Sequence, residues 1–281
     1  MPRAVECFYP GSSFPAVSIT GNRCALNCKH CSKKYLEGMI PATTPEELIS
    51  VADALAERGA HGFLLSGGAD VSGRVGLAEY APAIEQIKTT TSLSINAHIG
   101  LSTRDEIERL VKSGVDSFSV DVYGSDDTIR EVIGTGASAD DYFEVAQNLK
   151  RAGAKRLAPH ICIGVHGGKV KGEFETIARL QKLAPPVLVL ISLIPTKGTP
   201  YSTVKAPDAE TVRSVIVRAK EELPDTRLLL GCMRSKRERA SEASFVEAGL
   251  DGIVLPSLRT VDELVSKGYT VKKRSVCCSL I

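Results

Sequence analysis

Short runs of β-branched and apolar residues alternate along the chain with longer amphipathic stretches. Eight such runs predict buried β-strands at 16–20, 62–66, 93–97, 117–121, 159–163, 187–191, 227–231 and 252–256. Between them, apolar residues recur at helical spacing and predict helices at 45–57, 78–88, 104–113, 141–151, 172–183, 208–222 and 236–248. Glycines directly follow several of these helices, as is typical of helix C-termini: Gly59, Gly114, Gly153 and Gly249.

The alternation of strand and helix predicts an α/β fold with a parallel sheet, because helical crossovers cover continuous apolar strands. Eight strand–helix units predict a (βα)8 barrel of the TIM type. We assign residues 14–270 to this barrel, 1–13 to an N-terminal extension and 271–281 to a cysteine-containing C-terminal tail. Both extensions are expected near the barrel mouth. Catalytic groups of such barrels lie at the C-terminal ends of the strands.

Composition narrows the function classes. The 281 residues are 43% hydrophobic, and 35 basic against 33 acidic residues leave a net charge of +2. This balance argues against a dedicated nucleic-acid binder. No run of about eighteen apolar residues predicts a membrane span, and the chain begins without an apolar signal region, so we expect a cytoplasmic protein. Eight cysteines, three of them clustered, are typical of metal ligands in a reducing compartment.

Three clustered cysteines carry the clearest chemical signal. Cys24, Cys28 and Cys31 have the spacing C-x3-C-x2-C and directly follow the first predicted strand. Such a loop can hold three irons of a [4Fe-4S] cluster. An open position on the fourth iron is typical of a catalytic metal site, and it can chelate S-adenosylmethionine (SAM). The alternative is a structural zinc site with His30 as the fourth ligand, although no second C-x2-C unit follows.

This cysteine loop resembles the signature of the radical SAM superfamily. The resemblance implies that a cluster on the three catalytic cysteines cleaves SAM to a 5′-deoxyadenosyl radical, using a ferredoxin-type electron donor. It also implies a SAM-binding turn after the second predicted strand, at Ser66, Gly67 and Gly68, for the methionine amino group. An ordinary strand–helix turn is the alternative. We include His30 among the cofactor-binding residues.

Polar residues at later strand ends are further candidates. Asp121 ends the fourth predicted strand, and the resemblance implies an acid there for the ribose hydroxyls of SAM. His160 is a candidate cofactor ligand on the fifth strand, and Cys162 shares its face because side chains alternate. Histidines at strand ends are also common as core or capping residues, and this alternative applies equally to His98 and His166.

The later part of the chain resembles biotin synthase. A turn at Gly198 and Thr199 resembles the one that abuts adenine in biotin synthase-like enzymes, and the similarity extends from about Ser18 to Ser257. Biotin synthase holds a second, [2Fe-2S] cluster with three barrel cysteines and an arginine. Cys162 and Arg227 match two of these positions, but the segments of the other two contain no cysteine. A biotin-type second cluster is therefore not expected.

The remaining cysteines suggest another second cluster. Cys7 precedes the barrel, Cys232 follows the seventh strand, and Cys277 and Cys278 lie in the tail. We expect the termini to fold over the mouth, so that Cys7, Cys232 and one or both tail cysteines bind a second iron–sulfur cluster. Unrelated thiols are the alternative. Lipoyl synthases hold such a cluster with an N-terminal cysteine set and a serine in an Arg-Ser-Ser segment, and Arg274-Ser275 stands in this tail.

The chain looks most like the biotin synthase-like archaeal proteins that share lipoyl synthesis between two radical SAM subunits. This resemblance implies sulfur insertion into an octanoyl chain on a carrier protein or peptide, with a second radical SAM subunit as partner. One alternative is a carbon-skeleton rearrangement without sulfur transfer. Another is a non-catalytic, cluster-carrying subunit.

Overall fold

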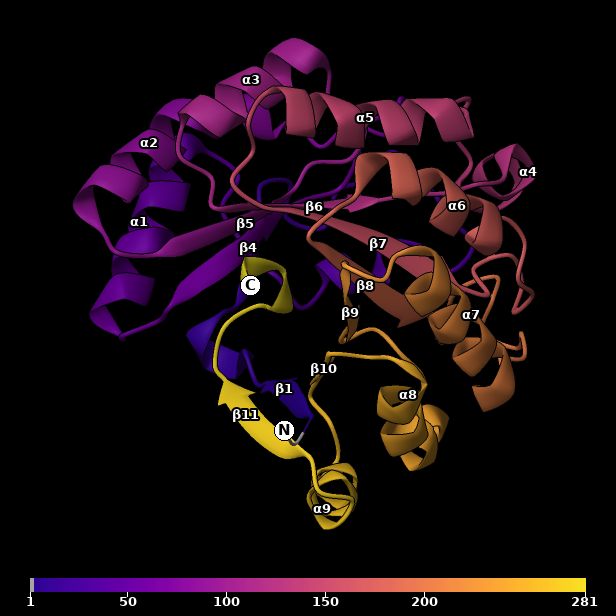
Figure 1. Cartoon of the computed structure of the whole chain (residues 1–281). Coiled ribbons are helices and arrows are strands. Elements are labelled where there is room, and N and C mark those ends of the chain that lie inside the picture. Colours follow the sequence, from indigo (N-terminus) through magenta and orange to yellow (C-terminus); the bar gives the residue numbers. More distant parts are fainter. Residues whose placement is uncertain (1–2) are drawn as a thin grey trace.

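A curled sheet of parallel strands forms the centre of the protein. The computed structural model describes residues 3–281, apart from the side chain of Arg237. The sheet has 11 strands in the order β11-β1-β10-β9-β8-β7-β6-β5-β4-β2-β3, and helices cover its outer face (Figure 1). The predicted α/β class with a parallel, barrel-like sheet is confirmed.

All eight predicted strands are present. They are β2 (Ala16–Ser18), β4 (Gly62–Ser66), β5 (Ser94–His98), β6 (Ser117–Asp121), β7 (Leu157–Ile163), β8 (Val187–Ser192), β9 (Arg227–Leu230) and β10 (Gly252–Val254). Each pairs in parallel with its neighbours, so their C-terminal ends face one end of the sheet.

Three further strands extend the sheet. β1 (Ala4–Phe8) pairs with both β10 and β11 (Thr270–Arg274), while β3 (Ile40–Pro41) pairs with β2. Within residues 3–281, β3 and β11 are the outer strands and are not paired with each other, so the sheet curls without closing through backbone hydrogen bonds. The expected N-terminal extension is therefore a strand inside the sheet, and the expected boundary at residue 270 falls on the first residue of β11.

The predicted helices surround this sheet. They are α1 (Pro45–Glu57), α2 (Ala81–Thr90), α3 (Arg104–Lys112), α5 (Ala139–Arg151), α6 (Glu173–Leu183), α7 (Ala209–Glu222) and α8 (Glu242–Ala248). Capping boxes at Thr103 and Ser138 fix where α3 and α5 begin. The prediction missed α9 (Leu258–Ser266) and the short α4 (Asp126–Thr128), which continues into a π-helix, η4 (Ile129–Ile133). None of the described helices is both long and apolar enough to cross a membrane.

Two apolar layers follow from the alternation of side chains along the strands. Outward-facing residues such as Phe63, Ile95 and Phe118 pack beneath the helices. Inward-facing residues form a second cluster inside the curl: Phe8, Ala158, Val187, Val189, Leu229 and Val254, together with Cys278. The interior of the sheet is thus partly filled by side chains of the C-terminal tail.

The tail lies inside the barrel rather than over its mouth. The short 3-10 helix η6 (Cys278–Leu280) is joined to β6: Ser117 Oγ donates to the carbonyl of Ser279 at 2.5 Å, and the hydroxyls of Ser119 and Ser279 are 3.2 Å apart. Ser117 is the first residue of β6, so the tail fills the part of the interior toward the N-terminal strand ends (Figure 1). The expected position was wrong because Cys278 packs with inward-facing apolar residues.

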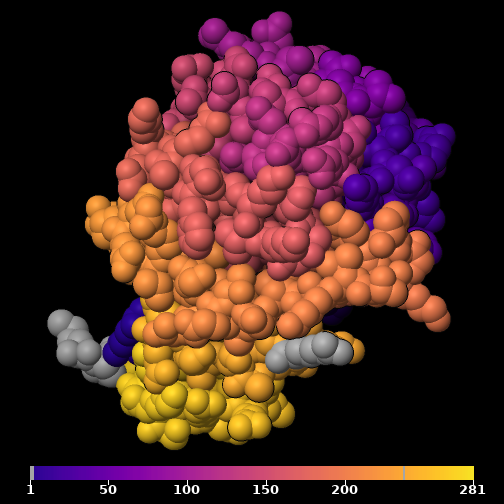
Figure 2. Space-filling view, turned by 90° about the vertical axis from the view of Figure 1, so that its right-hand side faces the viewer, coloured from indigo at the N-terminus to yellow at the C-terminus, as the bar shows by residue number. Residues whose placement is uncertain are grey.

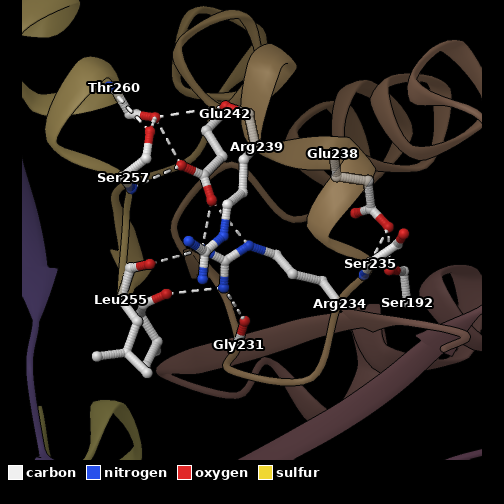
Figure 3. A network of polar contacts seen from close by, with 11 residues as sticks. Ser192, Gly231, Arg234, Ser235, Glu238, Arg239, Glu242, Leu255, Ser257 and Thr260 are labelled. Carbon is white, nitrogen blue, oxygen red and sulfur yellow. Dashed lines mark hydrogen bonds and ion pairs between the residues drawn. The ribbon is translucent and has the colours of Figure 1, made fainter. Parts of the chain in front are cut away.

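The C-terminal elements form one end of the molecule, and β1 lies there between β10 and β11 (Figure 2). A buried ion pair joins these elements: the side chains of Arg234 and Glu242 are only 5% and 0% exposed (Figure 3). Arg234 also donates to the carbonyls of Gly231 and Val254, and Glu242 accepts from Thr260 Oγ1 at 2.6 Å. This network links the ends of β9 and β10 to the first turn of α9.

Candidate cluster and cofactor site

The three motif cysteines lie on the loop that follows β2. Cys24, Cys28 and Cys31 are half-buried and free of disulfides. Burial, reinforced by the nearby Cys31 and Cys24, raises the pKa of Cys28 to about 12. Iron binding reverses this balance, because a coordinating thiol is deprotonated. In residues 3–281, no three Cys, His, Asp or Glu side chains are close enough together to hold one metal ion.

Backbone hydrogen bonds anchor the cysteine loop at three points. Ala25 donates to the carbonyl of Ala69 at 2.7 Å, in the turn after β4. Lys29 donates to Val132 of the π-helix at 2.9 Å and accepts from Tyr201 at 3.2 Å, in the segment after β8. The loop is therefore fixed to the C-terminal ends of three separate strand–helix units, which is where catalytic groups of such barrels lie.

The glycine turn lies against this loop. A Cβ on Gly68 would come within 2.0 Å of the Arg23 carbonyl oxygen and 2.6 Å of Cys24 Cβ. The backbone N–H of Gly68 donates to Thr20 Oγ1 at 2.7 Å. Only glycine permits this approach, so the structure brings Gly67 and Gly68 together with the cysteine loop.

Two other polar residues of this region serve the fold. Ser66 Oγ donates to the backbone carbonyl of His98 at 3.1 Å and thereby links β4 to β5. Asp70, which follows the glycines, accepts from both the backbone and the hydroxyl of Ser72 and pairs with Arg74 at 3.1 Å. Its carboxylate is thus engaged within its own turn.

The predicted adenine turn also contacts the cysteine loop. Thr199 Oγ1 donates to the carbonyl of Thr196 at 2.8 Å, and the Thr196 hydroxyl is 3.0 Å from that of Tyr35. Gly198 has a positive φ of 82°, and a Cβ there would lie 3.3 Å from Cε of Lys34. The segment after β8 therefore packs on the residues that follow Cys31.

A polar layer lies inside the barrel at the ends of β5 and β6 and in the middle of β7. His98 Nε2 is 3.3 Å from Asp121 Oδ2, and the rings of His98 and His160 stack with centroids 6.0 Å apart. The side chains of His98 and Asp121 keep 31% and 36% of their surface exposed, so they remain accessible. Sequence reasoning missed this pairing, although polar residues at adjacent strand ends were a signal for it.

The three side chains of this layer favour different charge states. Burial opposes ionisation, but Asp121 outweighs it and raises the pKa of His98 above its ordinary value. The same attraction, by His98, outweighs burial and lowers the pKa of Asp121. Burial and the neighbouring His98 together lower the pKa of His160 to about 4. These shifts favour an ion pair between His98 and Asp121 beside a neutral His160 imidazole.

His30 faces the same region with an unused nitrogen. Its Nδ1 is buried and has no hydrogen-bond partner in the described part of the chain. Burial lowers the pKa of His30, while Asp121 acts in the opposite direction. A buried polar atom without a partner is rare in a folded protein and marks a place for a further group.

Comparison with known proteins decides the family. Residues 18–180 match the profile described as the Radical SAM superfamily. The chain belongs to the radical SAM superfamily. It is 26% identical over 254 residues to a biotin synthase of Helicobacter hepaticus, covering 87% of each protein. It is 24% identical over 285 residues to one of Parabacteroides distasonis, covering 95% of this chain and 86% of that protein. The predicted superfamily and the biotin synthase-like character are confirmed.

Solved structures of the same fold agree with this assignment. The FeFe-hydrogenase maturase HydG from Carboxydothermus hydrogenoformans superimposes with a TM-score of 0.67 at 18% identity, over 96% of this chain and 68% of HydG. Methylornithine synthase (PylB) superimposes with a TM-score of 0.63 at 16% identity, over 98% of this chain and 84% of PylB. These likenesses show that the radical SAM barrel is the fold.

Membership of the superfamily implies a [4Fe-4S] cluster and SAM, and the residues fit both. The cysteines Cys24, Cys28 and Cys31 share one anchored loop. Gly68 lies against that loop at a distance that excludes a side chain, and His30 has an unpaired buried nitrogen. A loop, a glycine turn and a free polar atom are thus available at one end of the barrel.

One expected ligand of a second cluster lies elsewhere in this radical SAM protein. Cys7 is fully buried and alternates along β1 with Glu6 and Phe8, and Phe8 packs in the inner cluster, so Cys7 faces outward. Burial, with a contribution from Glu242, raises the pKa of Cys7 to about 11. Its expected convergence with the tail cysteines is therefore contradicted, because the two lie on opposite faces of the sheet.

The other three cysteines come from two segments: Cys232 is exposed, whereas Cys277 is half-buried and Cys278 is buried. Cys277 and Cys278 belong to the inner apolar cluster, and Asn96 Nδ2 is 3.5 Å from Cys277 Sγ. The pKa of the Cys232 thiol, directly after β9, is raised, mainly because its sulfur is desolvated and then because of the nearby Cys277. Arg227, by contrast, forms an ion pair with Glu6 at 2.5 Å, so its guanidinium is already engaged and not free to bind a cluster.

Proposed function

We propose that Cys24, Cys28 and Cys31 hold the [4Fe-4S] cluster of this radical SAM enzyme. When bound, the cluster and SAM supply a 5′-deoxyadenosyl radical. The observation that carries the assignment is the contact of Gly68 with Arg23 and Cys24, which joins the cysteine loop to the glycine turn. No other group of cysteines in the described chain has such a turn against it.

The chain's own residues position SAM. Backbone groups of Gly67 and Gly68 take the methionine end, Asp121 and His160 take the ribose, and the turn at Gly198 and Thr199 takes the adenine. His30 contributes its unpaired Nδ1. The surrounding barrel excludes water, which keeps a reactive radical from side reactions.

We further propose that the reaction is sulfur insertion into an octanoyl chain, as in a lipoyl synthase-like subunit. Support comes from the similarity to biotin synthases and from three candidate ligands of a second iron–sulfur cluster: Cys277 and Cys278 pack inside the curl, and the exposed Cys232 lies near enough to sense Cys277. The substrate would arrive on an octanoylated carrier protein or peptide. A ferredoxin-type donor and a second radical SAM subunit would complete the system in the cytoplasm, where thiols stay reduced.

Anaerobic reconstitution tests both proposals in one experiment. Iron, sulfide, 5′-deoxyadenosine and sulfur in the octanoyl product are measured for the wild type and for single Cys→Ala variants. Cys24→Ala should lose one cluster and all SAM cleavage. Cys277→Ala should lose the second cluster and the sulfur product but keep 5′-deoxyadenosine formation. Retained 5′-deoxyadenosine formation in Cys24→Ala would reject the radical assignment.

A second candidate is a rearrangement without sulfur transfer. The outward position of Cys7 favours it, because the second cluster that would supply sulfur then lacks one of its expected ligands. A product that contains no new sulfur would decide for this candidate. Absence of 5′-deoxyadenosine formation by the isolated chain would instead indicate a non-catalytic, cluster-carrying subunit.

A further inference from the structure

The strand β11 ends the sheet with one of its edges unpaired. It pairs with β1 on one side only, and within residues 3–281 it is one of the two outer strands (Figure 1). The N–H of Thr270 donates to the carbonyl of Arg3 on the β1 side. Because such bonds alternate in direction along a strand, the backbone groups of Val271 and Lys273 point to the free edge. A further strand can add to the sheet here through backbone hydrogen bonds.

Two lysines without ion pairs mark this edge. Lys272 and Lys273 are exposed, and within residues 3–281 neither is paired with an acid. Arg274, by contrast, is held by Glu6 at 2.7 Å. Because side chains alternate along a strand, Lys272 points to one face of the sheet and Lys273 to the other. A strand with two successive carboxylates matches both lysines, one on each face.

A second copy of this chain fits the edge poorly. A two-fold axis pairs β11 with itself in antiparallel orientation. The register that pairs all of Thr270–Arg274 then places Lys272 opposite Lys272. Like charges directly opposite each other destabilise a strand pair. The edge therefore favours a partner of opposite charge over a second copy.

An apolar stripe lies on α9, the helix that precedes this strand. Leu258 and Val265 are 83% and 56% exposed and lie about two helical turns apart, on one side of α9. With Leu255, just after β10, they make three of the six large apolar side chains exposed in residues 3–281. The helix and the strand lie at the same end of the molecule (Figure 2). Exposed apolar groups that gather in this way mark an interaction site, so the lysines do more than keep β11 apart from other chains.

We propose that the free edge of β11 docks a partner protein by strand addition, and that the docked strand carries two successive acidic residues. Backbone hydrogen bonds to Val271 and Lys273 supply affinity, and the two carboxylates fix the register. The apolar stripe on α9 gives the same partner a second contact. This inference goes beyond the proposed function, because it holds whichever reaction the barrel catalyses.

The test measures binding of two short strand peptides to the full-length, anaerobically reconstituted protein. The peptides share the frame threonine-valine-X-X-valine-threonine, where X is glutamate in one and lysine in the other, and fluorescence anisotropy reports binding. The wild type should bind the glutamate peptide at least about tenfold more tightly than the lysine peptide. The double variant Lys272→Glu, Lys273→Glu should reverse this preference. The matched control Lys112→Glu, Lys182→Glu should keep it, because it changes exposed lysines of α3 and α6 and alters the net charge equally.

A proline variant tests the backbone part of the docking. Lys273→Pro removes the lysine and the N–H at the free edge but spares the pairing with β1, whereas Lys273→Gln removes only the charge. Lys273→Pro should abolish binding of the glutamate peptide. Lys273→Gln should weaken it by only about threefold. Thermal melting confirms that both variants are folded.

Several outcomes overturn the inference. Equal affinity for the two peptides, binding of neither, or equal effects of the proline and glutamine variants would show that the lysines only protect the edge. A wild-type dimer that Lys273→Pro dissociates in analytical ultracentrifugation would show that a second copy occupies β11. None of these results bears on SAM cleavage, so the proposed function stands or falls separately.

Discussion

Gly68 lies so close to the backbone of Arg23 that a Cβ would meet the Arg23 carbonyl oxygen at 2.0 Å. Gly68→Ala should therefore push the cysteine loop away from the turn. We expect reconstituted Gly68→Ala to hold clearly less iron than the wild type and to bind SAM at least about tenfold more weakly. Iron analysis and calorimetry under anaerobic conditions measure the two effects.

Two other glycines serve as controls for this substitution. A Cβ on Gly67 would meet only side-chain atoms of Ile19 and Thr20, at 3.0–3.2 Å, whereas none lies within 4 Å of one on Gly38. Gly67→Ala should have an intermediate effect and Gly38→Ala none. Equal iron content in all three variants would show that the contact does not hold the loop.

The tail cysteines and Cys7 should behave differently in iron binding. Cys277 packs inside the curl with the exposed Cys232 nearby, while Cys7 faces outward from β1. Cys232→Ala and Cys277→Ala should each lower the iron content by one cluster, because each removes a thiolate ligand. Cys7→Ala should keep full iron. Loss of iron from the Cys7 variant would contradict the placement of β1.

The ion pair of His98 and Asp121 predicts pH-dependent stability. The pKa of His98 is raised above 6.5, so its contribution is present below about pH 6.5 and is lost as pH rises through the raised value. The pKa of Asp121 is lowered below 3.8, so its contribution is present above about pH 3.8 and is lost as pH falls through the lowered value. The other titratable side chains that interact with the pair are His30, His160, Cys28, Cys162, Tyr123 and Tyr142.

Denaturant unfolding at several pH values measures this effect. The difference in unfolding free energy between wild type and His98→Gln should be largest from about pH 4 to pH 6.5 and should shrink at higher pH. His61→Gln, which changes an exposed histidine, should follow the wild type throughout. If the difference in unfolding free energy between wild type and His98→Gln grows with rising pH, the ion pair does not contribute as proposed.

Removal of Arg234 should destabilise the C-terminal end of the molecule. Glu242 would remain fully buried without its counter-charge (Figure 3). We expect Arg234→Met to reduce the unfolding free energy by about 3–5 kcal/mol. Thr260→Val, which removes one hydrogen bond to Glu242, should cost only about 1 kcal/mol. Denaturant midpoints compare the stability of the two variants. Equal losses of unfolding free energy would show that the unpaired charge of Glu242 is not the cause of the destabilisation.

Sequence patterns predicted the strands that are apolar and missed those that are not. The eight predicted strands are rich in β-branched or aliphatic residues, whereas β11 reads Thr-Val-Lys-Lys-Arg and is almost wholly exposed. β3 has two residues and ends in Pro41. Hydrophobic periodicity gives no signal for edge strands of this kind.

Only part of the candidate site could likewise be predicted from the sequence. The meeting of the cysteine loop with Gly67 and Gly68 could be predicted, because the C-terminal ends of parallel strands share one end of a barrel. The outward orientation of Cys7 could not be predicted, because it depends on strands that pair with β1 from more than two hundred residues away. The same holds for the tail, whose interior position is set by Ser117 and Ser119.

The position of β1 between β10 and β11 has a consequence for how the protein is made. Ala4–Phe8 are synthesised more than two hundred residues before both strands that pair with them, Gly252–Val254 and Thr270–Arg274. Since nascent chains grow by about 5–20 residues per second, this first strand waits for more than ten seconds with both edges unpaired. Exposed strand edges of this kind promote aggregation. The nascent chain is thus most vulnerable during synthesis, and slower translation lengthens that interval.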